Sequence, residues 1–282
     1  MLSGLRIEFI LHPCPPCKDM GAWVTRARVL IMKYVIFISR MLCRVNIPLG
    51  NIMESQMPAN DEAVMLSIFP GLRGKNNKTT ARYIDMNACA ARGKKRPDGS
   101  RYRNADLTDR ALQRLHRRWG VATSFGGYLE DRRELWRGTY LKPDSAVHLA
   151  IDINVRAGTE LTVKYPSRVE KIMHDPGQDG GWGGVVFFRL DKPIGKITHF
   201  LYAHLAKGSA RVKEGAAILP GDIAATIGRC HENGGWYEHL HVQALTQEAW
   251  DKFQGDLSKF DGYAAKPKGA EHPYFPDPMV LL

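Results

Sequence analysis

The amino-acid sequence predicts an α+β fold in which a compact, mostly antiparallel β domain follows a basic, partly helical N-terminal region. From Val147 onward, short β-rich runs are separated by Gly, Pro and Asp, and no βαβ alternation is visible. Charge divides the chain at the same place: residues 1–146 hold 25 Lys and Arg against 13 Asp and Glu, whereas residues 147–282 hold 15 against 16. One strong helical pattern precedes the β-rich part.

These features divide the 282 residues into three predicted parts. Residues 1–58 form an N-terminal segment that we expect to be poorly structured. Residues 59–139 form the basic, partly helical region, and residues 140–282 form the β domain. The length suits one large domain or two modest ones, and 44% hydrophobic with 24% charged residues is ordinary for a soluble globular protein.

Two patterns in the first segment lack the context that their usual functions need. The CPPC of Cys14 and Cys17 has neither the strand–helix setting of a redox motif nor the second cysteine pair of a structural zinc site. The apolar run Val29–Ile38 is broken by Lys33, lacks an A-x-A-like cleavage site and is far shorter than the ~20 residues that span a bilayer. We therefore expect no export signal and no transmembrane span. A cytoplasmic location is the default, with secretion or delivery to the cell wall by another route as the alternative.

Basic residues gather between positions 71 and 118. Residues 71–103 are expected to be loop-like, and a helix is expected from Asn104 or Asp106 to Gly120. One face of this helix carries four arginines: Arg110, Arg114, Arg117 and Arg118. The charge is typical either of a solvated helix face or of a surface for nucleic acid or another polyanion, cell-wall glycan included. No recognised nucleic-acid motif accompanies it.

Seven runs in the β domain have the composition of short strands. They are HLAIDI at 148–153, ELTV at 160–163, RVEKIM at 168–173, GGVVFFRL at 183–190, ITHFLYAH at 197–204, DIAATIG at 222–228 and HLHVQAL at 239–245. A helical pattern returns only near Glu248–Lys259.

Five residues of this domain are suited to metal and proton chemistry: His148 and Asp152 as H-x3-D, His204 in YAHL, and His239 and His241 as H-x-H. Zinc favours tetrahedral nitrogen, sulfur and oxygen donors, and a catalytic site leaves one position open. Three of the five could hold a zinc ion, and two would remain to move protons beside it. Any single histidine can be an ordinary core residue, but a carboxylate in an apolar strand is costly to bury without a partner or a metal.

Strand geometry places a condition on this metal site. In a strand, H-x-H puts His239 and His241 on one face, with Cα atoms roughly 6.6 Å apart. His148 and Asp152 in one straight strand would lie about 13 Å apart. Bonds to zinc are only ~2.0–2.2 Å long. The two can share a metal only if His148 lies on a turn or bulge that enters the strand of Asp152.

With these stretches the sequence resembles the lysostaphin/LytM-type zinc endopeptidases, which are metallopeptidases that cleave peptidoglycan. The resemblance covers residues 147–244, in the family's order. The matching stretches are HLAIDI at 148–153, AGTELTV at 157–163, GGWGGVVFF at 180–188, LYAHL at 201–205, VKEGAAILPGDIAATIG at 212–228 and HLHVQ at 239–243. A narrower likeness, to a subgroup often fused to aminotransferases, is carried by GGYLEDR at 126–132, ENGGW at 232–236 and PDP at 276–278.

The resemblance implies a LytM-like domain over residues 140–282 and a division of labour among the five residues. His148, Asp152 and His241 would be the zinc ligands, and His204 and His239 the catalytic pair beside the reacting water. Tyr140 lies upstream of the first ligand, where family members often carry a tyrosine that stabilises the transition state. Two glycine tracts, 180–184 and 234–235, would form turns near a groove that a peptide backbone approaches.

The function that the resemblance implies is zinc-dependent hydrolysis of an amide bond, in peptidoglycan cross-links or stem peptides or in a small intracellular peptide. Two alternatives remain open. One is a non-catalytic LytM-like module that binds peptidoglycan or a partner, and the other is a polyanion-binding protein that acts through residues 71–118. The sequence does not indicate an oligomeric state.

Overall fold

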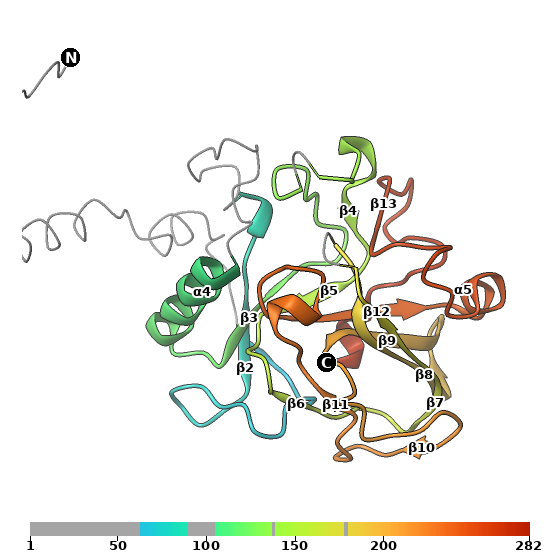
Figure 1. Ribbon diagram of the computed structural model, residues 1–282, viewed down its shortest axis with the longest axis horizontal. Helices are drawn as coiled ribbons and strands as arrows, with labels where there is room; N and C mark the ends of the chain where they lie inside the picture. Colours follow the sequence, from blue (N-terminus) through green and yellow to red (C-terminus); the bar gives the residue numbers. More distant parts are fainter. Residues whose placement is uncertain (1–62, 89–104, 137–138, 178–179) are drawn as a thin grey trace, which may run out of the picture. The chain divides into compact units, whose positions relative to one another are not determined.

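The computed structural model describes residues 63–88, 105–136, 139–177 and 180–282 (Figure 1). The predictions for residues 1–58, with the CPPC and the apolar run at 29–38, lie outside the described residues. So does most of the basic stretch at 91–103, which falls in the gap between residues 88 and 105. In the part that the structure describes, no helix is both long enough and apolar enough to cross a membrane.

A nine-stranded sheet forms the centre of the described chain, in the order β1-β2-β3-β5-β12-β9-β8-β7-β10. Neighbouring strands in it run antiparallel except β2 and β3. Two pairs, β11-β6 and β13-β4, form small separate sheets. The strands are β1 Val64–Met65, β2 Thr80–Tyr83, β3 Thr123–Gly126, β4 Val147–His148, β5 Ile151–Ile153, β6 Glu160–Leu161, β7 Ser167–Asp175, β8 Gly183–Ile194, β9 Ile197–Leu205, β10 Ala217–Ile218, β11 Ala225–Thr226, β12 Leu240–Leu245 and β13 Tyr263–Ala264.

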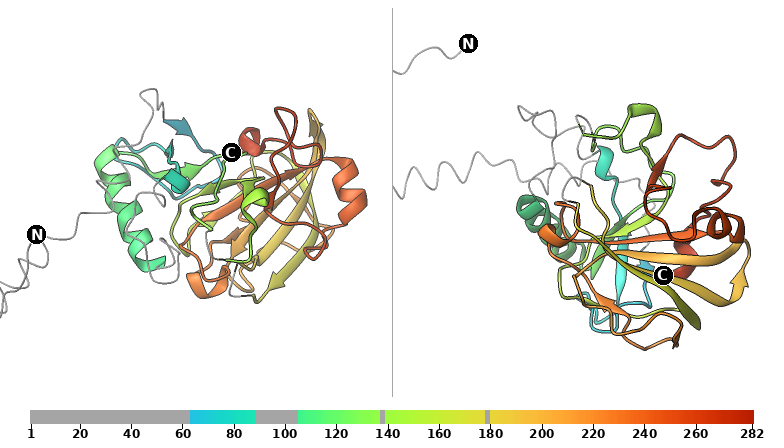
Figure 2. Two further views of the ribbon diagram at one scale, coloured as in Figure 1. Left: turned by 90° about the horizontal axis from the view of Figure 1, so that it is seen from above. Right: turned by 45° about the vertical axis from the view of Figure 1, so that its right-hand side comes forward.

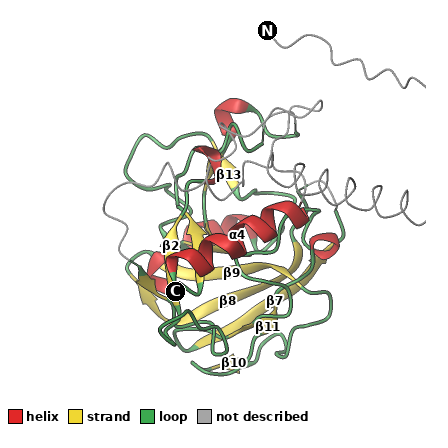
Figure 3. Cartoon of the chain, turned by 90° about the vertical axis from the view of Figure 1, so that its left-hand side faces the viewer, coloured by secondary structure: helices red, strands yellow, loops and turns green. Residues whose placement is uncertain are grey.

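Helices are few beside these strands (Figure 3). The helical elements are α4 Ala105–Trp119, α5 Gln247–Phe253, and the 3-10 turns η1 Pro143–Ser145, η2 Cys230–Glu232 and η3 Pro278–Leu281. Both predicted helices are present, and Gly120 follows α4 with a φ of +70°, the conformation of a helix-ending glycine. The predicted α+β class with a mostly antiparallel β domain is confirmed.

The long strands bury side chains on both faces of the sheet. In β8, Val186 and Phe188 belong to one hydrophobic core, whereas Val185 and Phe187 belong to another. This follows from the two-residue period of a strand. Phe253 of α5 packs in the second core. Helix α5 lies beside the long strands (Figure 2). The run GGVVFF is apolar without interruption, as expected for a central strand that is buried on both faces. Fully burying one such side chain stabilises a fold by about 1.5–3 kcal/mol.

The N-terminal region adds strands that the sequence does not predict. Residues 71–103 are expected to be loop-like, but Thr80–Tyr83 form β2, which pairs in parallel with β3. The loop prediction is wrong there because β2 is only four residues long and its partner begins 40 residues later in the chain, so no local pattern reveals the pairing. The main sheet thus includes strands from both sides of residue 140.

Helix α4 joins this part of the sheet through its apolar side. Leu112 and Leu115 pack with Ile84 and Trp136 in a third core. The four arginines of its other face, Arg110, Arg114, Arg117 and Arg118, are exposed. Polyanion binding through this face stays a prediction.

Candidate metal centre

Three of the five sequence-predicted residues come together as a group that could hold a metal ion. His148, Asp152 and His241 are buried and offer one ligand atom each, all within 4.8 Å of one another. The Nδ1 atom of His241 lies 3.0 Å from Oδ1 of Asp152, and Nε2 of His148 lies 3.4 Å from each of these atoms. Donors held tetrahedrally at ~2.0–2.1 Å from zinc lie about 3.3 Å apart. The donor set and its spacing therefore fit a zinc ion.

The chain brings His148 to Asp152 by changing sheets between them. His148 ends β4, which pairs with β13, whereas Asp152 lies in β5, which pairs with β12 and β3. The geometric condition named a turn or bulge that enters the strand of Asp152. His148 instead ends a separate strand, and this also keeps the two residues off one straight strand. On β12, His241 is the direct register partner of Asp152, so the two side chains share a face of the sheet.

Hydrogen bonds orient both imidazoles of the candidate ligand group. Nδ1 of His148 lies 3.2 Å from the carbonyl oxygen of Gly127, which can only accept a hydrogen bond. The proton of His148 thus belongs on Nδ1, and the lone pair of Nε2 points into the cluster. For His241, Nε2 lies 3.0 Å from Oε1 of Gln243, so a proton there leaves Nδ1 free toward Asp152.

The other two histidines lie beside the three candidate ligands. Nδ1 of His239 lies 2.7 Å from the carbonyl oxygen of Tyr237 and donates to it, which leaves Nε2 as an acceptor 3.9 Å from Oδ1 of Asp152. The ring of His204 lies 4.4 Å from that of His239, centroid to centroid. The structure thus brings all five predicted residues together, three as a ligand group and two at its side.

His204 reaches this cluster through an unusual backbone conformation. Its neighbour Ala203 is the register partner of His241, so regular alternation along β9 would turn His204 to the opposite face. The φ of His204 is +63°, however, and this breaks the alternation. Positive φ is uncommon outside glycine and costs of order 1–3 kcal/mol. The surrounding structure therefore holds His204 in place.

Burial sets the protonation states of the cluster. It lowers the pKa of His148 to about 3 and lowers the pKa values of His204 and His239 as well. Burial alone would raise the pKa of Asp152, but the nearby His148 and Arg132 hold it well below its usual value. At neutral pH these three imidazoles are neutral and the carboxyl group is ionised, which are the forms that bind metals and accept protons.

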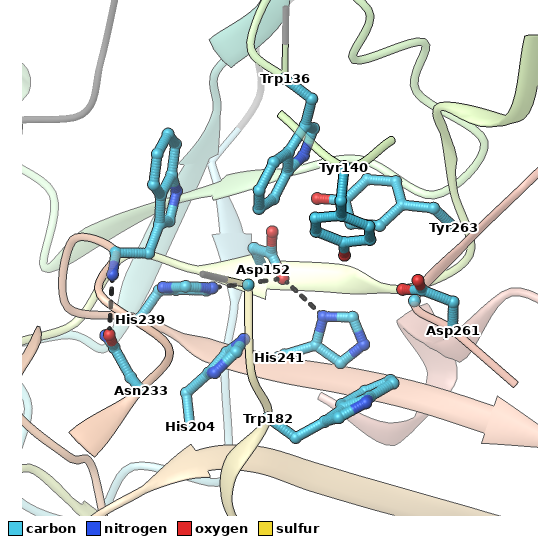
Figure 4. A pocket seen from close by; sticks show the side chains of 13 residues that line it. Trp136, Tyr140, Asp152, Trp182, His204, Asn233, His239, His241, Asp261 and Tyr263 are labelled. Atoms are coloured by element: carbon cyan, nitrogen blue, oxygen red, sulfur yellow. Dashed lines mark hydrogen bonds and ion pairs between the residues drawn. The ribbon is translucent and has the colours of Figure 1, made fainter. Parts of the chain in front are cut away.

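A pocket opens at this cluster (Figure 4). Asp152, His204, His239 and His241 are among the residues that line it. The rest of the lining includes an aromatic wall: Trp136, Tyr140, Trp182, Trp236 and Tyr263. His148 is not among the lining residues, and its ring centroid lies 5.2 Å from that of Tyr263.

Tyr140, which the resemblance places near the reaction, is part of this wall. Its hydroxyl group lies near Asp261, another residue of the lining, and burial together with this carboxyl group raises the pKa of Tyr140. Sequence reasoning does not find the rest of the wall. Trp182 lies within one predicted glycine tract and Trp236 directly follows the other, and this position is the only local sequence signal for either residue. No local sequence pattern predicts that Trp136 and Tyr263 line the pocket.

The two glycine tracts touch each other beside the pocket. A Cβ atom on Gly234 would lie 2.3 Å from the carbonyl oxygen of Gly181, and Gly234 has a φ of +84°. Both the close approach and the conformation therefore require glycine.

Gly234→Ala is expected to destabilise the protein more than Gly158→Ala does. Gly158 has a similar φ of +81°, but its added Cβ atom would meet nothing within 4 Å. The difference between the two losses of stability therefore measures the contact between the tracts. Overpacking of this kind costs about 1–3 kcal/mol. Urea denaturation of both variants measures it, and equal losses would show that the tracts can move apart freely.

Three solved structures show what the chain is similar to. LytU is 23% identical, with a TM-score of 0.32, over 49% of this chain and 74% of that chain. The catalytic domain of the antimicrobial peptidase lysostaphin from Staphylococcus simulans is 18% identical, with a TM-score of 0.32, over 48% of this chain and 78% of that chain. A zinc-containing peptidase from Vibrio cholerae is 19% identical, with a TM-score of 0.30, over 36% of this chain and 28% of that chain. No family model and no curated protein matches the chain.

Proposed function

We propose that this protein is a zinc-dependent metallopeptidase that hydrolyses an amide bond in peptidoglycan cross-links or stem peptides. The observation that carries the proposal is the buried group of His148, Asp152 and His241, with zinc-like spacing, beside two neutral histidines on a pocket. The substrate class rests on the sequence resemblance given above.

Each residue around the pocket has a role that its contacts support. Zinc, when bound by the three ligands, supplies a Lewis acid that polarises the scissile carbonyl and lowers the pKa of water. His239 is suited to accept the proton of the attacking water, because Tyr237 holds its Nδ1 proton and Nε2 keeps its lone pair. The ring of His204 and the hydroxyl group of Tyr140 are neutral donors on the same pocket and would stabilise negative charge on the carbonyl oxygen. One of the two histidines then returns a proton to the leaving amine.

Metal removal tests the proposal directly. The full chain is incubated with purified peptidoglycan as isolated, after chelation, and after zinc is added back, and newly exposed amino groups are identified. We expect release only in the zinc-containing samples. Zinc-loaded protein that binds peptidoglycan without releasing amino groups would support the non-catalytic module instead.

A further inference from the structure

The stretch Gly126–Arg132, GGYLEDR, lies against two of the three candidate ligands. We propose that this segment, called the ligand cradle below, positions His148 and Asp152 for the metal, and that Arg132 is its central positioning residue. The inference rests on the proposed function, because it concerns ligands of the same metal site.

The cradle holds His148 by backbone contacts. The amide of Leu129 donates to the carbonyl oxygen of His148 at 2.8 Å, and the amide of His148 donates to the carbonyl oxygen of Glu130 at 2.9 Å. The carbonyl oxygen of Gly127 accepts a hydrogen bond from Nδ1 of the same histidine. The main chain of His148, the orientation of its ring and the position of its proton are thus all set by one short segment.

Arg132 holds Asp152 by its side chain. The guanidinium group is 1% exposed, its Nη1 donates to Oδ2 of Asp152, and its Nε donates to Oε2 of Glu130 at 2.8 Å. Glu130 is itself held at Oε1 by the hydroxyl group of Tyr83 on β2, at 2.9 Å. With Oδ2 occupied, only Oδ1 of Asp152 faces His148 and His241. The contact therefore directs one defined oxygen to the metal.

Gly126 gives a second, independent indication that this place is reserved for the guanidinium group. It lies directly opposite Asp152 in the pairing of β3 with β5. A Cβ atom there would lie 2.5 Å from Nη2 of Arg132 and 3.3 Å from Oε2 of Glu130. A side chain at position 126 would therefore push Arg132 away from Asp152.

Two effects of Arg132 on metal affinity oppose each other. Its positive charge repels a cation, whereas its hydrogen bond fixes the ligand oxygen in place. Glu130 pairs with the same guanidinium group and offsets the repulsion. Loss of a residue that orients a ligand typically weakens metal binding 10–100-fold. We expect orientation to outweigh repulsion.

The test measures zinc affinity of the metal-free full chain, by competition with a chromogenic chelator. The variants are Arg132→Gln, which removes the charge, and Arg132→Lys, which keeps the charge but carries all its N–H donors on one nitrogen atom. Lysine therefore lacks the planar fork by which Nε and Nη1 of Arg132 reach Glu130 and Asp152 separately. The matched control is Arg133→Gln, because the side chain of Arg133 is 59% exposed and pairs with Asp131. Visible absorption of the Co²⁺-loaded proteins reports the coordination geometry independently of activity.

We expect Arg132→Gln to bind zinc about 10–100-fold more weakly and to alter the Co²⁺ spectrum. Arg132→Lys should lie between it and the wild type, and Arg133→Gln should match the wild type. If Arg132→Gln does not fold, Gly126→Ala keeps Arg132 and displaces it, and should weaken binding in the same direction. Unchanged or tighter zinc binding in the folded variant, or a lysine variant equal to the wild type, would overturn the positioning role. Failure of the wild type to bind zinc would instead overturn the proposed function.

Discussion

Replacement of Asp152 by alanine is expected to lower the free energy of unfolding of the metal-free protein by about 3–5 kcal/mol. The loss comes from Arg132, whose buried guanidinium group would keep only Glu130 as its ionised partner. A buried charge that loses its partner is costly, because neither water nor another group compensates it. Urea denaturation in the presence of a chelator measures the effect without any contribution from bound metal.

Two comparison variants separate this charge effect from the simple loss of a side chain. His241→Ala removes another buried residue of the same cluster but leaves Arg132 and Asp152 paired, so it should cost less. The double variant Asp152→Ala/Arg132→Met removes both charges of this pair and leaves Glu130 with its hydrogen bond from Tyr83, and a double-mutant cycle then measures the coupling between Asp152 and Arg132. If Asp152→Ala costs no more than His241→Ala, the ion pair contributes little.

The five residues could be singled out from the sequence because H-x3-D, YAHL and H-x-H are local patterns, whereas their division into ligands and catalytic residues rested on the family resemblance. His148 was expected on a turn or bulge that enters the strand of Asp152, but the structure ends β4 at His148 and begins β5 at Ile151. His239, expected in the same strand as His241, directly precedes β12. The strand runs were also predictable, since alternating and continuous apolar stretches reflect burial on one or both faces.

The rest depends on contacts between distant segments. Tyr83 donates a hydrogen bond to Glu130, which lies 47 positions later in the chain, and no sequence pattern near either residue predicts this contact. The aromatic wall likewise brings Trp136 against Trp236, with ring centroids 5.2 Å apart. His204 is a different case: its residue type was identified, but its φ of +63° overrides the strand alternation from which its direction would be predicted.

The proposed division between ligands and proton-moving residues predicts opposite phenotypes for two histidines that are two positions apart. His239→Ala is expected to lower kcat by about 10²–10⁴-fold, the usual contribution of general acid–base catalysis, while zinc affinity stays near that of the wild type. His241→Ala is expected to lose zinc binding and activity together, because it removes one of three protein ligands. Steady-state kinetics on a peptide substrate and chelator competition separate the two quantities.

The physical basis of this contrast is the position of each ring relative to Asp152. Nδ1 of His241 lies 3.0 Å from Oδ1 of that carboxylate, whereas Nε2 of His239 lies 3.9 Å from it, and only the former belongs to the ligand group. His174→Ala, at an exposed position of β7, is the control and should change neither quantity. Loss of zinc in His239→Ala would place that residue among the ligands. Full activity in folded, zinc-loaded His239→Ala would instead assign the proton transfer to His204. Its ring lies next to that of His239 on the same pocket.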